Sequence, residues 1–185
     1  EADQEPKDNE DGSDIEQDAF TGAYLNTIEI PAHVDNIAPG AFSKSHIENI
    51  TVNADNDYFA AENGVLFDKE GKTLIAYPQC REPVGYTVPG GVSKIEDYAF
   101  AWFQDESEYE VVVNLPDSLK AIGEEAFQYS GVKNVKFGNN LEYAMHEIIE
   151  QGTIAIFDKY ACESIEVFEN GKKTGKTIAD LNICL

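Results

Sequence analysis

The strongest constraint on the fold is an Ala-Phe dipeptide, once Ile-Phe, that recurs with the same apolar residues behind it. In four units a large apolar residue, or once a Cys, stands five, eight and ten positions after the Phe. These sets are Leu25, Ile28 and Ile30 after Phe20; Ile47, Ile50 and Val52 after Phe42; Val132, Val135 and Phe137 after Phe127; and Cys162, Ile165 and Val167 after Phe157. Such a register indicates a repeated structural unit. Because one unit cannot bury its own apolar face, neighbours must stack into a solenoid.

The register extends upstream, where a Pro, a Val or Leu and an Ile precede the Phe by eleven, eight and five positions. The sets are Pro31, Val34 and Ile37; Pro89, Val92 and Ile95; and Pro116, Leu119 and Ile122. The alternation in Ile28–Pro31 predicts a strand with one buried face, which the Pro ends. In 122–127 the Ile, Ala and Phe fall on one side of a helix. Each unit is therefore predicted to contain a strand and a helical piece of one to two turns.

The interval from Phe42 to Phe100 is too long for one unit, whereas Phe20 to Phe42 spans 22 residues, within the leucine-rich-repeat range. The additional residues of this interval predict a β-hairpin, with strands at 64–67 and 74–78 around a charged turn. We expect its second strand to re-enter the strand-Pro register, as part of one altered repeat. The hairpin is expected to project from the side of the turns.

These features together resemble the BspA-like leucine-rich repeat family over roughly residues 18 to 168. The resemblance implies an α/β repeat solenoid, a right-handed superhelix of about five to six units with one curved, mostly parallel sheet. Short helices and turns would lie on the other side. The repeat domain is predicted over 18–185, with the hairpin-bearing insertion at 53–85 and a degenerate C-terminal capping repeat at 138–185.

The two ends of the chain depart from the repeat pattern. Residues 1–17 carry eight acids and one Lys, a composition that predicts a disordered tail suited to act as a spacer. Near the other end, Gly152 stands where the pattern expects an Ile. This departure fits a terminal capping unit, because end repeats must differ from the rest. The polar segment 169–176 is predicted to be a turn, with a last strand or cap in 178–185.

Charge excludes two classes of partner. Acidic residues outnumber basic ones by 35 to 13, for a formal charge of −22. Nucleic acid binding relies on Lys and Arg neutralising phosphate, so it is disfavoured, as are anionic membrane surfaces. The chain also has no run of eighteen apolar residues, so no transmembrane helix is predicted.

Parallel stacking predicts a ladder of residues on the open face of the sheet, between the buried strand side chains. The ladder comprises Glu29, Thr51, Ala76, Thr87, Asn114, Lys136 and Glu166. It is small, polar and mixed in sign, which suits hydrogen-bonded contacts to a protein or a glycan. A solvated face without a partner is an equally good interpretation, since fold does not assign function. Thr51, Thr87, Asn114 and Lys136 are the candidate ligand-binding residues here.

The segment 101–110 offers a second candidate, because it places Trp102, Phe103 and Tyr109 beside several acids. Aromatic side chains in a loop can anchor an interface. They also fold back to cover a neighbouring core, which is the interpretation that we favour.

Metal and catalytic sites have little support. The series Asn53, Asp55 and Asp57 lacks the Gly and the closing Glu of a calcium loop, so no metal or cofactor is predicted. His33 and His46, like the third His of the chain, lie away from any recognisable nucleophile motif, and no enzyme activity is predicted.

The three cysteines leave two alternatives open. Cys162 occupies a repeat position otherwise filled by large apolar residues and is interpreted as buried. A disulfide from Cys80 or Cys162 to Cys184 is the other possibility, because spacing does not fix connectivity.

The family resemblance implies a bacterial cell-surface or secreted protein of adhesin-like type. We therefore predict a monomeric, non-enzymatic module that binds a host, matrix or neighbouring-cell protein. The alternatives are a carbohydrate-recognition or accessory module of a glycan-processing system, and a scaffold with no external ligand. Attachment to the surface is expected to run through a removed N-terminal signal or a lipid, and the chain is not expected to insert in a membrane.

Overall fold

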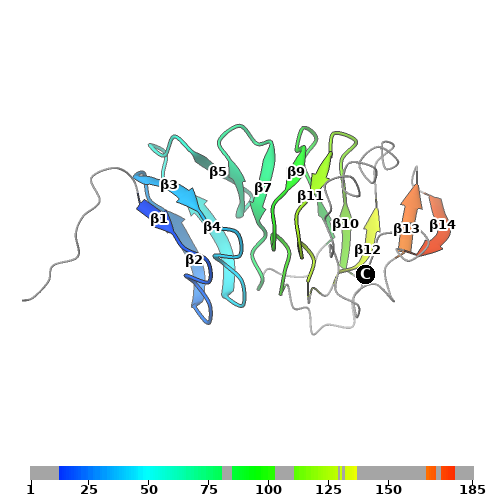
Figure 1. The fold of residues 1–185 in the computed structure, drawn as a ribbon, viewed down its shortest axis with the longest axis horizontal. Coiled ribbons are helices and arrows are strands. Elements are labelled where there is room, and N and C mark those ends of the chain that lie inside the picture. The colour runs from blue at the N-terminus through cyan, green and yellow to red at the C-terminus, as the bar shows by residue number, and fades with distance from the viewer. Residues whose placement is uncertain are drawn as a thin grey trace, which may run out of the picture.

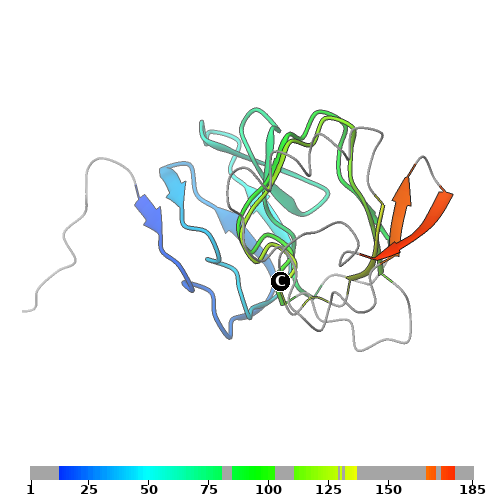
Figure 2. The same cartoon turned by 45° about the vertical axis from the view of Figure 1, so that its right-hand side comes forward.

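The strands of this computed structural model progress from the N-terminal to the C-terminal part of the chain along the long axis of a solenoid (Figure 1). Figure 2 shows the successive turns stacked side by side. The structure describes residues 13–80, 85–102, 111–128, 130, 132–136, 166–169 and 172–177.

Most turns of the solenoid contribute one strand to each of two rows. The first row contains β2 (Tyr24–Ile30), β4 (His46–Val52), β8 (Tyr86–Thr87), β10 (Val111–Asn114), β12 (Val132–Lys136), β13 (Glu166–Glu169) and β14 (Lys172–Thr177). The second contains β1 (Ser13–Ile15), β3 (Val34–Ile37), β7 (Thr73–Ala76), β9 (Lys94–Ile95) and β11 (Ala121–Ile122). Each row is divided at the insertion, between β4 and β8 and between β3 and β7. Elsewhere the neighbours within a row pair in parallel, except at β14. The predicted parallel solenoid is confirmed.

The register of the pairing follows the apolar spacing of the sequence. Leu25 pairs with Ile47 and Ile28 with Ile50, so the positions five and eight residues after each Phe are aligned. Ile47 and Ile50 are fully buried beneath the preceding turn. Burial of this repeated apolar ladder is what holds successive turns together.

The prediction of one continuous sheet is wrong, because the first row is divided. Strands β2 and β4 form one sheet, and β8, β10, β12, β13 and β14 form another. Irregular backbone takes the place of a partner strand beside β4. The Ile50 N–H donates to the Gly64 carbonyl (2.9 Å), and the Cys80 N–H donates to the Ile47 carbonyl (3.1 Å). The insertion thus satisfies the hydrogen bonds of β4 and separates the two sheets.

The predicted hairpin is confirmed, but it does not project from the solenoid. β6 (Val65–Asp68) pairs antiparallel with β7 and with β5 (Phe59–Glu62). Because β7 also pairs in parallel with β9, the hairpin is built into the second row of strands. Leu66 and Leu74 are fully buried there, which explains why the hairpin is held in the core.

This placement corrects the predicted register of the altered repeat. Ala76 is buried in β7 and is not part of the open ladder. The Tyr77 N–H donates to the Ala99 carbonyl (2.8 Å), as the Phe100 N–H does to Ala126 (2.7 Å). Ala76-Tyr77 therefore occupies the Ala-Phe position of its turn.

The predicted short helices are also wrong: in the part of the chain that is described, the Ala-Phe segments are series of tight turns and no helix is present. In the turn of Phe42, the N–H groups of Ala41, Ser43 and Ser45 donate to the carbonyls three residues earlier. The backbone is left-handed two residues before the Phe and two residues after it, which ends any helix. The residues concerned are Asp18, Gly40, Tyr98 and Glu125 before it, and Gly22, Lys44 and Trp102 after it.

The repeated rings stack along the axis. Phe20 lies over Phe42 with ring centroids 5.0 Å apart, and Tyr77, Phe100 and Phe127 form a second column with spacings of 5.1 and 4.8 Å. The last two rings of this column are at most 1% exposed. The predicted buried column therefore exists, in two segments.

Local structure at both ends differs from the prediction. Within the predicted tail 1–17, Ser13–Ile15 form β1 and pair with β3, because Ile15 stands five residues before Phe20 in the repeat register. The rest of that tail, 1–12, lies outside the described residues. At the other end, Lys172–Thr177 form a strand where a turn was predicted, antiparallel to β13. The remainder of the predicted capping repeat, apart from β13, lies outside the described residues.

Candidate functional site

The predicted polar ladder lies on two sheets. In the first, Glu29 pairs with Thr51; in the second, Thr87 pairs with Asn114 and Asn114 with Lys136. Thr51 and Thr87 are exposed, and Asn114 is half-buried. Lys136 is placed on this ladder by the backbone register. Glu166 follows it in β13, paired with Asn134 rather than with Lys136.

Hydrogen bonds fix several groups of this polar ladder. The Asn114 Nδ2 group donates to the Thr87 Oγ1 atom (3.1 Å), and the Asn53 Nδ2 group donates to a carboxylate oxygen of Glu29 (3.0 Å). The Thr51 hydroxyl donates to the Ile28 carbonyl (3.2 Å). Amides and hydroxyls held in this way present oriented donors and acceptors, which can recognise polar groups of a partner.

A second candidate lies where the first row of strands is interrupted. A hollow of about 230 Å³, which we call the junction pocket, is lined by Lys44, Ser45, His46, Gln79, Cys80 and Trp102. Residues from three turns meet here, two of them on either side of the inserted hairpin. Of this set, only Trp102 is predicted from the sequence as a candidate ligand-binding residue.

Repeat register explains how these side chains come together. Lys44 and Trp102 both follow a Phe by two positions, in left-handed backbone that turns each side chain to the rim. The Lys44 Nζ atom lies 4.6 Å from the centre of the Trp102 ring, a cation–π contact. Aligning the positions that follow each Phe marks Lys44 and Trp102 as equivalent, but not as neighbours, because the turn of Tyr77 lies between them in the chain.

The ring of His46, which lines the junction pocket, is stacked against the ring of Tyr24, which does not. Tyr24 and His46 are register partners in β2 and β4, and their rings stack at 3.9 Å between centroids. Tyr24 is 77% exposed, so this stack adds a flat surface beside the pocket.

Trp102 lies between the turn of Phe127 and the junction pocket. Its backbone N–H donates to the Gln128 carbonyl (2.8 Å) on the next turn, and its half-buried side chain lines the pocket. Phe103 and Tyr109, the other two aromatic candidates, lie outside the described residues.

The surroundings of the Cys80 thiol in the junction pocket disfavour its thiolate form. The Cys80 Sγ atom lies 3.3 Å from the His46 Nδ1 atom. Desolvation, and to a smaller extent the charge of Glu48, raises the pKa of the Cys80 thiol above its ordinary value. Nucleophilic cysteines need the opposite shift, so this pair lacks the electrostatics of a Cys–His nucleophile. Cys80 is a free thiol, and the other two cysteines lie outside the described residues.

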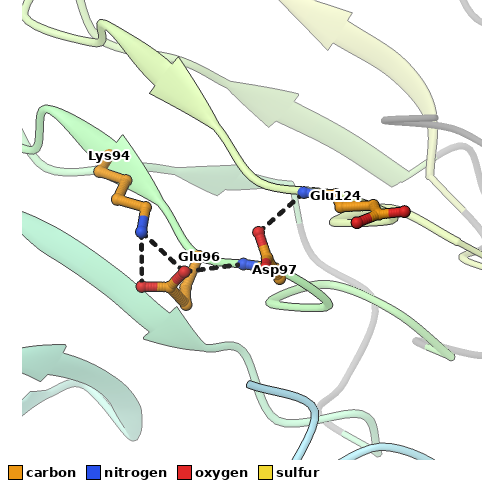
Figure 3. A network of polar contacts seen from close by, with 4 residues as sticks. All are labelled: Lys94, Glu96, Asp97 and Glu124. Atoms are coloured by element: carbon orange, nitrogen blue, oxygen red, sulfur yellow. Dashed lines mark hydrogen bonds and ion pairs between the residues drawn. The ribbon is translucent and has the colours of Figure 1, made fainter. Parts of the chain in front are cut away.

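The acidic side chains near β9 and β11 have structural partners (Figure 3). Both oxygens of the Glu96 carboxylate accept hydrogen bonds from the Lys94 Nζ group (2.7 and 2.9 Å). The Asp97 carboxylate accepts from the Glu124 backbone N–H (2.8 Å) and so connects two turns. The Asp97 carboxylate thus ties two turns together, whereas the Glu96 carboxylate is held within its own turn.

Across the described ranges, no three His, Cys, Asp or Glu side chains come close enough to share a metal ion. The Asn53 side-chain oxygen accepts the Asp55 backbone N–H (3.1 Å), so this part of the Asn53–Asp57 series forms a local turn. Nor does the described part of the chain contain a helix long and apolar enough to span a membrane.

Comparison with known proteins decides the family. The model of the BspA-type leucine-rich repeat region matches in six copies, over residues 9–63, 76–155 and 93–171, more than half of the chain. The chain belongs to the BspA-type leucine-rich repeat family. Repeat domains of this family and fold are typically non-enzymatic. No curated protein matches this chain.

Solved structures of similar proteins come from bacteria. A leucine-rich cell surface protein of Faecalibacterium prausnitzii shares 35% identity over 64% of this chain and 31% of its own, with a TM-score of 0.54. A leucine-rich repeat protein of Eubacterium ventriosum shares 24% identity over 60% of this chain and 36% of its own, with a TM-score of 0.49. The chain thus spans about a third of the length of these structures.

Proposed function

We propose that this BspA-type repeat domain is a non-enzymatic binding module of a bacterial cell-surface or secreted protein. It holds a protein partner, from a host, a matrix or a neighbouring cell, through the polar ladder. The observation that carries this proposal is the oriented pair of exposed Thr87 and half-buried Asn114, which lies on a regular sheet and is held by its own hydrogen bond. The similar Faecalibacterium prausnitzii protein, described as a cell surface protein, supports the location.

The physical basis is repetition. Register places one polar side chain per turn at a fixed spacing, so a partner can make several modest hydrogen bonds along the solenoid. Each such bond contributes about 1 kcal/mol, and several are needed for stable attachment. The acidic field of the chain would favour basic partners, whose binding should weaken as salt rises.

Capture on the immobilised full chain from an extract of host extracellular-matrix and cell-surface proteins tests the proposal. A specific partner should be retained by the original chain and lost when Thr87→Arg and Asn114→Arg are combined. Retention by the Thr51→Arg variant tests whether the partner also contacts the first sheet. Lys120→Gln, in an exposed side chain on the turns, is the matched control, and circular dichroism confirms folding.

Equal retention by the double variant and the original chain would exclude the polar ladder as the binding face. Failure of any specific protein to be retained would contradict the proposal as a whole.

A further inference from the structure

The first described turn of the solenoid leaves one edge of a long strand open. β1 and β2 lie at one end of the array (Figure 1). Among the described residues, β2 pairs with β4 alone and β1 with β3 alone. A strand at the edge of a sheet presents a row of backbone N–H and C=O groups with which a further strand can pair. The outer edge of β2 presents such a row.

This edge lacks the features that usually prevent pairing with another chain. Proteins protect edge strands by keeping them short, by placing Pro or Lys in them, or by interrupting them with β-bulges. β2 has seven residues, none of them Pro or Lys, and its register with β4 runs without a shift. By contrast β5, which ends the sheet of the hairpin, has only four residues.

Apolar side chains are uncovered in the same place. Leu25 is 43% exposed, whereas its register partner Ile47 on the next turn is 0% exposed. Ile28 is half-buried, whereas its partner Ile50 is fully buried. A strand added to β2 would therefore cover Leu25 and Ile28 in the way that β2 covers their partners.

Charge selects among the chains that could add here. Residues 13–30 contain no Lys, Arg or His and four exposed acids, which are Asp14, Glu16, Asp18 and Glu29. A second copy would bring the same negative charges to the edge, and juxtaposed like charges repel. Residues 1–12 have six acids, one Lys and no large apolar residue, a composition that does not fit the edge either. A basic segment with apolar side chains is complementary to it.

We infer that the outer edge of β2 binds, by strand addition, an extended segment of a partner protein in which Lys or Arg alternates with apolar residues. In this mode of recognition, backbone hydrogen bonds give the affinity and alternate side chains give the specificity. The apolar side chains lie over Leu25 and Ile28. The basic side chains between them lie on the open side of the sheet, where Glu29 is exposed.

This surface differs from the one on which the proposed function depends. The edge of β2 belongs to the first sheet, whereas Thr87 and Asn114 lie on the second. The two proposals can therefore fail separately, because the variants that test one leave the other surface unchanged.

A short synthetic peptide tests the inference on the full chain. The probe is fluorescein-labelled Lys-Ile-Lys-Val-Lys-Ile-Lys amide, titrated with the protein and followed by fluorescence anisotropy at about 0.1 M salt. It should bind saturably. The peptide with Glu in place of every Lys should bind at least about tenfold more weakly. A version with every backbone amide N-methylated keeps the side chains and their charge but donates no backbone hydrogen bonds, so it should lose as much.

Hydrogen exchange followed by mass spectrometry locates the peptide. When the peptide binds, exchange should slow in the segment 24–30, because outward N–H groups of β2 gain partners, and should stay unchanged in 65–76. Leu25→Ala should weaken binding several-fold, as should Asp14→Asn combined with Glu16→Gln. The matched control is Glu62→Gln combined with Glu70→Gln, at exposed positions of the hairpin, which should leave binding unchanged.

Four outcomes would overturn the inference. They are equal binding of the N-methylated and unmodified peptides, equal binding of the acidic peptide, unchanged exchange in 24–30, and unchanged binding in Leu25→Ala. Sedimentation velocity of the chain alone provides a further check. A concentration-dependent dimer that is lost in Leu25→Ala would assign the edge to a second copy and so contradict a basic partner.

Discussion

The rings of Phe100 and Phe127 lie 4.8 Å apart at an interplanar angle of 7°, although 27 residues separate them in the chain. Hydrogen bonds run alongside: the Phe100 N–H donates to the Ala126 carbonyl (2.7 Å). Side-chain stacking and backbone bonding therefore connect the same two turns. The interior of the solenoid depends on such one-to-one alignment between successive repeats.

Removal of a central ring should be severely destabilising. Phe127→Ala should cost about 3–5 kcal/mol, because the ring is fully buried and its loss leaves a cavity. Against a typical stability of about 5–15 kcal/mol, this loss is large. Urea unfolding followed by circular dichroism measures it. Phe20→Ala, at the half-buried end of the other column, should cost clearly less, and an equal loss would contradict a core built on the column.

Asn56 fastens the inserted hairpin to the preceding repeat. Its fully buried amide donates to the Pro31 and Val34 carbonyls and accepts from the Tyr58 and Phe59 N–H groups, each at 2.8 Å. Every hydrogen-bonding position of the side chain is thus used.

Asn56→Ala should therefore destabilise the fold by about 2–4 kcal/mol, since four backbone groups lose a partner in the interior. Asn53→Ala is the control, because that side chain lies at the surface and should cost less than about 1 kcal/mol. Thermal unfolding of the two variants compares them. Similar melting temperatures would show that the Asn56 bonds are replaced by water.

Gly123 is required by a close approach between turns. A β-carbon at this position would collide with the backbone nitrogen and the carboxylate of Asp97, and the Gly123 N–H donates to the Ile95 carbonyl (2.8 Å). Gly123→Ala should push the turns apart and destabilise by about 1–3 kcal/mol. Gly90→Ala meets nothing within 4 Å and should be near neutral. Denaturant midpoints of the pair measure the difference, and equal midpoints would show that the turns can shift freely.

The repeat architecture could be predicted from the sequence because burial is periodic. The spacing of Ile47 and Ile50 behind Phe42 aligns in the structure with the equivalent residues of the preceding turn. The same reasoning misplaced Ala76-Tyr77, since a following Pro made the segment look like the end of a strand. Its actual role as an Ala-Phe equivalent depends on pairing between β7 and β9, which is not visible locally.

The turns were predicted as helices because apolar spacing alone cannot distinguish the two. Pro39-Gly40 is a strong local signal for a turn with a left-handed third residue, and Gly40 has a φ of 76°. In the other repeats Asp18, Tyr98 and Glu125 adopt that conformation without a glycine, held by contacts between turns. The junction pocket was not predicted for a related reason. It forms where the hairpin divides the first row of strands, and this division depends on tertiary structure rather than on a local sequence pattern.

The environment of Cys80 predicts how its reactivity depends on pH. Desolvation first, and then the charge of Glu48, raises the thiol pKa, so the reactive thiolate forms only at a higher pH than in an ordinary cysteine. Alkylation of native Cys80 by iodoacetamide, followed by mass spectrometry of its peptide, should be slower near pH 8 than in the urea-denatured chain. The two rates should converge as pH rises through the native pKa. Glu48→Gln should recover part of the difference, whereas Glu62→Gln, at an exposed position of β5, should recover none. Faster alkylation in the native chain than in the denatured one would mean that His46 activates the thiol, and would reopen a nucleophilic role for this pair.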